Sequence, residues 1–176
     1  MSGFDGIPCN MTGIGTKMKE GGYATHMVGK WDARMATSDH TPKGRGFDSS
    51  LSYFYHANDY YTEQAGACNK TRIVDLWDTD KPASNLNGTG PDNYEDGLFK
   101  ERVLDIIRNH DPSTTLFLYY APHIVHTPYQ VRGISWQVWI PLIFKQTKQA
   151  YLQLTVSTCG HSYLDRIRLL LEWTYP

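Results

Sequence analysis

The chain has 176 residues, of which 40% are hydrophobic and 20% charged, and its formal net charge at pH 7 is −1. This length permits one domain with a substantial core. The near-neutral charge gives no electrostatic case for binding nucleic acid or an anionic membrane surface. The longest apolar run, residues 136–144, is too short to span a bilayer. An aromatic content of 13% argues against a disordered chain, so the composition predicts a folded domain without a membrane span.

The first third of the chain predicts a helix, a strand and a turn. Residues 12–20 allow a short helix, which the Gly21-Gly22 pair ends. Residues 23–28 then form a strand that we expect Gly29 to break. Residues 30–32, Lys-Trp-Asp, therefore follow the carboxyl end of this strand.

The middle of the chain is mainly loop. Residues 37–48 are rich in proline, glycine and charge, which is typical of a loop. The aromatic residues 49–62 fit either a strand or a packed loop. Residues 69–90 predict a loop that contains a strand at 71–77.

The clearest predicted helix follows this loop. Asn93 is its expected N-cap, and Glu95 and Asp96 suit the positive end of the helix dipole. Four apolar residues recur at helical spacing and predict one buried face: Phe99, Val103, Ile106 and Ile107.

A continuous apolar run at residues 115–120 predicts a central strand with both faces covered. The order helix, strand, loop occurs twice, which favours an α/β sheet that is at least partly parallel. In such sheets, sites lie outside the carboxyl ends of the strands. We therefore expect residues 29–32 (GKWD) and residues 122–126 (PHIVH) to face one another across a common cleft.

Each candidate residue also has a structural interpretation. Lys30 and Trp31 suit an anion-binding cation beside an aromatic wall, or equally a lysine whose stem packs beside a core indole. His123 and His126 direct an imidazole into the cleft, or else belong to a surface loop. His26, inside the first strand, is predicted to be packed and hydrogen-bonded rather than catalytic.

The loop aspartates form no tight calcium-binding pattern, and we expect them to be solvated: Asp39, Asp48, Asp59, Asp75, Asp78 and Asp80. The three cysteines allow at most one disulfide. Three Asn-x-Thr sequons, at Asn10, Asn69 and Asn87, are expected glycosylation sites and favour a secretory or lysosomal route.

Together these stretches resemble the sulfatase family, particularly its arylsulfatase B-like branch. The resemblance covers residues 8–131 and rests on GYATHMVGKW (22–31), GRGFD (44–48), NDYYT (58–62), NKTR (69–72) and the helix at 98–110 that leads into LFLYYAPHIVHTPYQV. It implies an alkaline-phosphatase-like α/β sheet with flanking helices, incomplete in this chain. Residues 1–131 would form part of the catalytic domain, and residues 132–176 a divergent tail of unknown role.

The same resemblance implies a sulfuric ester hydrolase that acts on a small sulfate ester or a sulfated polysaccharide. In the family, a cysteine in C-x-P-S-R becomes the formylglycine nucleophile, and a calcium ion polarises the sulfate. The resemblance implies that Lys30 bridges nucleophile and sulfate, and that His126 bonds the sulfate near the leaving oxygen. Asp32 stands where the family has a histidine that touches the nucleophile, and His40 is a candidate substitute.

The family's nucleophile and metal ligands have no counterpart in this sequence. The stretch from Cys68 to Arg72 has the right spacing but carries Lys70 where proline belongs. The resemblance places the aspartate and asparagine calcium ligands before residue 1 and beyond residue 131. We therefore expect no metal ligand, no formylglycine and no activity in the isolated chain. Two alternatives stay open: a non-catalytic truncated sulfatase-like protein, and a phosphate-ester hydrolase of the same fold.

Overall fold

The computed structural model describes residues 6–66, 71–124, 126–127 and 130. The tail expected at 132–176 and the sequon at Asn69 lie outside these residues. The described elements are α1 (Ile14–Glu20), β1 (Ala24–Lys30), η1 (Ser38–His40), β2 (Ser49–Tyr53), β3 (Gln64–Gly66), β4 (Arg72–Val74), β5 (Trp77–Asp78), β6 (Lys81–Pro82), η3 (Ser84–Leu86), η4 (Pro91–Asn93), α2 (Glu95–Asn109) and β7 (Leu116–Ala121). Within the described residues, no helix is long and apolar enough to cross a membrane.

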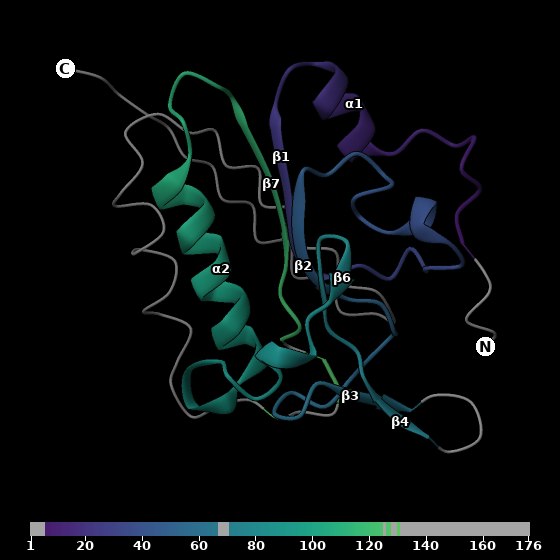
Figure 1. Ribbon diagram of the computed structural model, residues 1–176, viewed down its shortest axis with the longest axis vertical. Helices are drawn as coiled ribbons and strands as arrows, with labels where there is room; N and C mark the ends of the chain where they lie inside the picture. The colour runs from purple at the N-terminus through teal and green to yellow at the C-terminus, as the bar shows by residue number, and fades with distance from the viewer. Residues whose placement is uncertain (1–5, 67–70, 125, 128–129, 131–176) are drawn as a thin grey trace, which may run out of the picture.

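The centre of the molecule is a five-stranded sheet with the order β6-β5-β2-β1-β7 (Figure 1). β1 pairs in parallel with both β2 and β7, whereas β5 pairs antiparallel with β2. The register sets Lys30 opposite Tyr53 and Gly29 opposite Ala121, so three strands end at one edge. The predicted, partly parallel α/β sheet is confirmed.

Helix α2 packs along one face of this sheet, and α1 lies on the other side of β1 (Figure 1). On the α2 face, Phe99 and Val103 are buried against the strands, and Ile106 and Ile107 pack at the margin, as their spacing predicts. The buried core on this face consists of Val28, Leu51, Tyr53, Leu76, Ala83, Phe99, Val103 and Leu118. Burial of this apolar surface is the main contribution to the stability of the α2 face.

The predicted strand break at Gly29 is wrong. β1 continues through Gly29 to Lys30. Gly29 has a φ of 104°, and a Cβ there would lie 1.9 Å from the carbonyl oxygen of Ala121. The glycine therefore permits a close approach of the β7 backbone rather than ending the strand.

Both predicted helix starts are also shifted. α1 begins at Ile14 with Gly13 as its N-cap. α2 begins at Glu95 with Tyr94 as its N-cap, because Asn93 belongs to the preceding turn and has a φ of 55°. The N-cap of α2 therefore lies one residue after the predicted position, in a segment where only Tyr94 separates a 3-10 turn from the helix.

The strand predicted at 71–77 is divided in two. β4 pairs with β3 in a separate two-stranded sheet, whereas β5 joins the central sheet. The chain turns between them at Asp75, whose carboxylate accepts hydrogen bonds from the backbone N–H groups of Phe54 and Tyr55. Asp75 is buried, so the prediction of a solvated aspartate is wrong at this position.

The apolar run before the histidine loop forms β7, but its place in the sheet differs from the prediction. Among the described strands, β7 is the last on its side of the sheet rather than a central one. Only Leu118 in β7 is buried. A continuous apolar run therefore identified the strand correctly and its position incorrectly, because burial depends on which elements cover it.

Candidate functional site

Lys30 and Asp32 lie at the carboxyl end of β1. The Lys30 side chain is only 16% exposed, and its Nζ lies 3.6 Å from Oδ2 of Asp32. Asp32 has a φ of 52°, the left-handed region that aspartate tolerates better than most residues. The stem of Lys30 is thus covered while its ammonium group reaches the sheet edge beside a carboxylate.

Trp31 is a packing residue rather than a wall of the site. Its indole Nε1 donates to the carbonyl oxygens of Arg34 at 3.0 Å and His40 at 2.8 Å. Its ring meets Phe47 edge to face, with centroids 6.0 Å apart. The structural interpretation holds for Trp31, and the indole fixes the turn that presents Lys30.

His56 and His126 complete a group of side chains at the same edge. His56 follows β2, and its Nδ1 lies 3.7 Å from Oδ1 of Asp32. His126 follows β7, and its ring centroid lies 5.3 Å from that of His56 at an interplanar angle of 81°. We call Lys30, Asp32, His56 and His126 the edge cluster. The GKWD and PHIVH stretches thus lie near one another, as expected, linked through His56; a common cleft between them stays a prediction.

Tyr60 holds the histidine loop in place. Its hydroxyl donates to the carbonyl oxygens of His126 at 2.9 Å and His123 at 3.2 Å. Its ring stacks on the His123 ring with centroids 3.8 Å apart. The Tyr60 backbone N–H in turn donates to Gln130 Oε1 at 2.9 Å. Part of the NDYYT stretch therefore serves to position the loop that carries His126.

His123 is buried and does not belong to the edge cluster. Its Nδ1 lies 2.8 Å from Oε2 of Glu95, at the first turn of α2, and its backbone N–H donates to Asp96. Burial lowers the pKa of His123 to about 4. Burial raises the pKa of Glu95 to about 8 and that of Asp96 to about 7. Since burial disfavours both charges, it favours a neutral carboxyl on Glu95 beside a neutral imidazole on His123.

The two acids at the start of α2 thus do more than complement the helix dipole. Glu95 also accepts a hydrogen bond of 2.7 Å from the Asn58 side chain. Asn58, Glu95 and Asp96 are all buried. They tie the segment after β2 and the start of α2 to the loop after β7, and so fix both histidine-bearing segments.

His26 and His40 do not belong to the edge cluster. His26 is half-buried and shares a hydrogen bond of 2.7 Å with Ser49 Oγ, so its structural role is confirmed. Burial lowers the pKa of His26. The His40 ring lies 2.9 Å from Thr37 Oγ1 and 3.6 Å from Cys9 Sγ, on a separate loop. The imidazole beside Asp32 is His56 instead.

Sequence reasoning missed His56, although a signal for it existed. The rule that led to Lys30 and His126 applies equally to the residues after β2, because β2 is parallel to β1. Residues 49–62 were read as a strand or packed loop, so no carboxyl end was assigned there. The buried role of Glu95 had no comparable signal.

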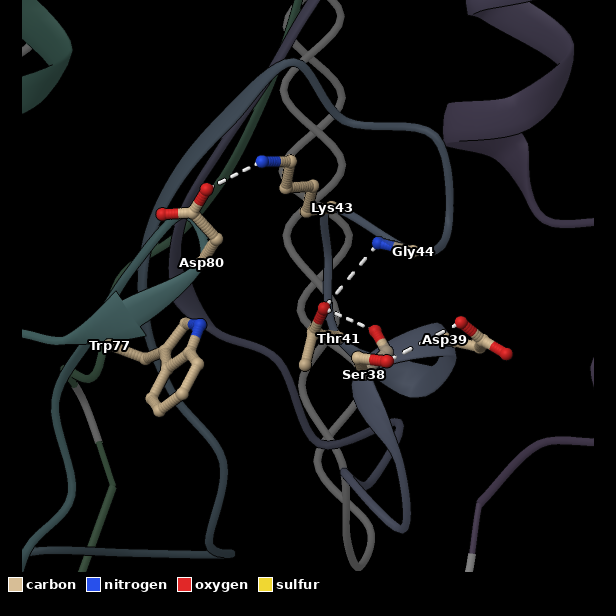
Figure 2. A pocket seen from close by; sticks show the side chains of 7 residues that line it. All are labelled: Ser38, Asp39, Thr41, Lys43, Gly44, Trp77 and Asp80. Carbon is tan, nitrogen blue, oxygen red and sulfur yellow. Dashed lines mark hydrogen bonds and ion pairs between the residues drawn. The ribbon is translucent and has the colours of Figure 1, made fainter.

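A shallow pocket of about 250 Å³ lies elsewhere in the described chain (Figure 2). It is lined by Ser38, Asp39, Thr41, Lys43, Gly44, Trp77 and Asp80. Figure 2 shows Lys43 and Asp80 pointing toward one another, in an exposed ion pair of 2.5 Å. No member of the edge cluster lines this pocket, so it is not the candidate site.

The described residues do not fit a calcium site by themselves. They contain no group of three histidine, cysteine, aspartate or glutamate side chains that could hold a metal ion. Calcium prefers six to eight oxygen ligands. The edge cluster supplies one carboxylate, Asp32, which already faces Lys30 and His56.

The two described sequons differ in their surroundings. Asn10 is exposed on a turn. Asn87 is half-buried, and its Nδ2 donates to the Thr62 carbonyl oxygen and to the Glu63 carboxylate. A glycan on Asn87 would replace one of these two amide hydrogens, whereas Asn10 accepts one without such a loss.

Comparisons with known proteins agree with this architecture. A family model described as Sulfatase matches residues 2–133. Arylsulfatase J of Mus musculus is 36% identical over 132 residues, which cover 72% of this chain and 21% of arylsulfatase J. An uncharacterized sulfatase of Schizosaccharomyces pombe is 26% identical over 119 residues, which cover 64% of this chain and 21% of that protein. The chain thus spans about a fifth of the length of these relatives.

Two crystal structures share the fold at low sequence identity. Ps i-CgsB aligns with a TM-score of 0.59 at 21% identity, over 74% of this chain and 30% of that one. Its complex with k-i-k-neocarrahexaose aligns with a TM-score of 0.58 at 22% identity, over 73% of this chain and 30% of that one. With the family match over residues 2–133, these findings identify the protein: the chain belongs to the sulfatase family and has its alkaline-phosphatase-like α/β fold.

Proposed function

We propose that this chain forms one wall of a sulfuric ester hydrolase site, in which Lys30 and His126 contact the sulfate group. The observation that carries the proposal is the edge cluster. It links Lys30, at the end of β1, to His126, after β7, through Asp32 and His56. Membership of the sulfatase family and the likeness to an arylsulfatase support the same chemistry.

The chemistry of sulfuryl transfer explains why these residue types suit the task. Negative charge builds on the transferring group and on the leaving oxygen, and fixed cations and donors lower the barrier by stabilising that charge. Lys30 supplies a partly buried ammonium, whose interaction with an anion is stronger than it is in bulk water. His126 donates its Nδ1–H to the Thr127 carbonyl at 2.7 Å, which leaves Nε2 to face a ligand; in the protonated ring Nε2 also carries a hydrogen and can donate it to a sulfate oxygen.

Asp32 carries a negative charge beside the proposed sulfate position, and this charge requires an explanation. A carboxylate repels a sulfate, so we infer that Asp32 acts on its neighbours rather than on the sulfate itself. Its two oxygens face Lys30 and His56, which offsets its charge within the cluster.

Calcium and formylglycine are not used in this proposal. The described residues lack the oxygen ligands for calcium, and the sequence contains no C-x-P-x-R. We infer that the 176-residue chain by itself binds sulfate esters without hydrolysing them. Hydrolysis of 4-nitrophenyl sulfate by the purified chain, abolished by Lys30→Ala, would contradict this inference.

The proposed substrate is a sulfate ester, either a small molecule or a sulfated polysaccharide. We also propose a secreted or lysosomal location, with Asn10 as a glycosylation site because it is exposed on a turn. Expression of the Asn69→Gln chain in a secretory host tests the location: a mass decrease on glycosidase treatment is expected, and it should disappear when Asn10→Gln is added but persist when Asn87→Gln is added.

The test of the site is a titration of the full chain with inorganic sulfate, followed by calorimetry or NMR. A charge-assisted hydrogen bond contributes about 1.5–3 kcal/mol, so Lys30→Ala and His126→Ala should each weaken sulfate binding roughly tenfold or more. Lys43→Ala is the matched control, because Lys43 pairs with Asp80 outside the edge cluster. Equal binding by the wild type and Lys30→Ala would refute the proposed site.

A further inference from the structure

His56 has no role in the function proposed above, yet it occupies the middle of the edge cluster. It follows β2, and its side chain is 63% exposed. Its Nδ1 lies 3.7 Å from Oδ1 of Asp32, and its ring meets the His126 ring edge to face at 5.3 Å. The imidazole is therefore open to a ligand while two members of the cluster contact it.

Asp32 is placed so that one oxygen faces Lys30 and the other faces His56. Oδ2 lies 3.6 Å from Lys30 Nζ, and Oδ1 faces His56. The left-handed backbone at Asp32, with a φ of 52°, aims the carboxylate between the two nitrogens. A carboxylate at Nδ1 favours the tautomer in which Nδ1 carries the hydrogen, as in other carboxylate–histidine pairs.

The His126 ring also carries a hydrogen on Nδ1, but a backbone carbonyl rather than a carboxylate favours it there. Its Nδ1 lies 2.7 Å from the Thr127 carbonyl oxygen, which can only accept, so Nδ1 carries the hydrogen. In both rings Nδ1 faces a protein acceptor, so Nε2 is the nitrogen that can face a ligand. A protonated ring donates from both nitrogens at once, to its protein partner and to an anion.

We propose that His56 is a third sulfate-contacting residue of this site, and that Asp32 is its positioning residue. Asp32 Oδ1 faces Nδ1 of His56 at 3.7 Å and orients the ring, and the ring in its protonated form donates from Nε2 to a sulfate oxygen beside Lys30 and His126. This inference rests on the proposed function and explains why a carboxylate belongs in an anion site: it orients a donor, and Lys30 together with a protonated His56 outweighs its charge.

The sulfate titration of the full chain tests the contact. His56→Ala should weaken binding of inorganic sulfate roughly tenfold. Because the side chain is largely exposed, this variant should fold normally. His110→Ala is the control, since the His110 ring bonds the Thr114 carbonyl before β7, at the opposite edge of the sheet. Loss of binding in Lys30→Ala and His126→Ala, with none in His56→Ala, would overturn this inference and leave the proposed function intact.

A double-mutant cycle tests the positioning role of Asp32. In the His56→Ala background, Asp32→Asn removes a repulsive charge and the ion pair that competes for Lys30, so it should tighten sulfate binding. With His56 present, the same change also releases the imidazole, so the gain should be smaller or reversed. An equal gain in both backgrounds would refute the positioning role.

A readout without sulfate separates this inference from the proposed function. Long-range ¹H–¹⁵N spectra of the histidine rings should show His56 with its hydrogen on Nδ1 in the wild type, and a shift toward Nε2–H in Asp32→Asn. The His126 signals should keep their tautomer, because Thr127 holds it. An unchanged His56 tautomer ratio in Asp32→Asn would contradict the inference whether or not sulfate binds.

Discussion

At the residue scale, Gly29 decides how closely β1 and β7 approach beside the site. It precedes Lys30 and pairs with Ala121, the last residue of β7. Its φ of 104° and the 1.9 Å between an ideal Cβ and the Ala121 oxygen leave no room for a side chain. The distance between the Lys30 and His126 segments therefore depends on the absence of a single methyl group.

We predict that Gly29→Ala destabilises the chain by more than the roughly 1–3 kcal/mol of a strained backbone alone, because β7 must also move. Gly22→Ala is the matched control: its φ is 82°, but a Cβ there meets nothing within 4 Å. Denaturant unfolding of both variants measures the difference. Similar losses of stability would show that close packing against β7 is unimportant.

At the element scale, the loop after β7 is held by the segment after β2. Tyr60 contributes one hydroxyl hydrogen, shared between two carbonyl oxygens, and a stacked ring to this contact, and Asn58 adds the hydrogen bond to Glu95. Loops that carry functional residues need such support, because a misplaced donor loses most of its effect on a ligand. The site thus depends on contacts between two loops that follow neighbouring strands of the sheet.

Tyr60→Phe should cost about 0.5–1.5 kcal/mol per lost hydrogen bond while keeping the stacked ring. Faster hydrogen exchange at the His123 and His126 amides is the expected signature, together with weaker sulfate binding. Tyr61→Phe makes the same chemical change on an exposed neighbour and should leave both unchanged. Unaltered exchange in Tyr60→Phe would show that the hydroxyl does not hold the loop.

At the scale of the whole molecule, buried acids couple folding to pH. Burial raises the pKa of Glu63 to about 7, of Glu95 to about 8 and of Asp96 to about 7. A group with a raised pKa holds its proton more tightly when folded, so its contribution is present at low pH and lost as pH rises through the folded value. His123 acts oppositely: its pKa falls to about 4, so its contribution is lost only as pH falls below 6.5.

The free energy of unfolding should therefore decrease from pH 6.5 to pH 8. Above pH 6.5 the contribution of His123 is constant, and near pH 8 Glu95 ionises in the folded chain. We expect a change on the order of 1 kcal/mol or more. Glu95→Gln keeps an acceptor for Asn58 and removes the ionisation, so the decrease should be smaller in this variant. Urea unfolding at the two pH values provides the measurement, with Glu101→Gln on the same helix as the control. A steeper decrease in Glu95→Gln would contradict the assignment.

The sequence by itself determined α2, β1 and β7, and the edge of the sheet at which the candidate residues lie. The 3.6-residue spacing of Phe99, Val103, Ile106 and Ile107 located α2, because periodicity is a local property. The apolar runs located β1 and β7, and parallel strands must end at one edge. Lys30 and His126 were therefore placed together from the sequence, and the family match over residues 2–133 agrees with the resemblance.

Only the tertiary structure decided which side chains meet at that edge. The pairing of Asp32 with His56, the burial of Asp75 and Glu95, and the passage of β1 through Gly29 each depend on residues far away in the chain. A local pattern predicts a solvated loop acid at Asp75 and a helix-dipole acid at Glu95, because it contains no information on what covers these side chains. The register of β1 against β2 and β7 supplies that information: it brings three strand ends together, so that a carboxylate and two imidazoles share one site.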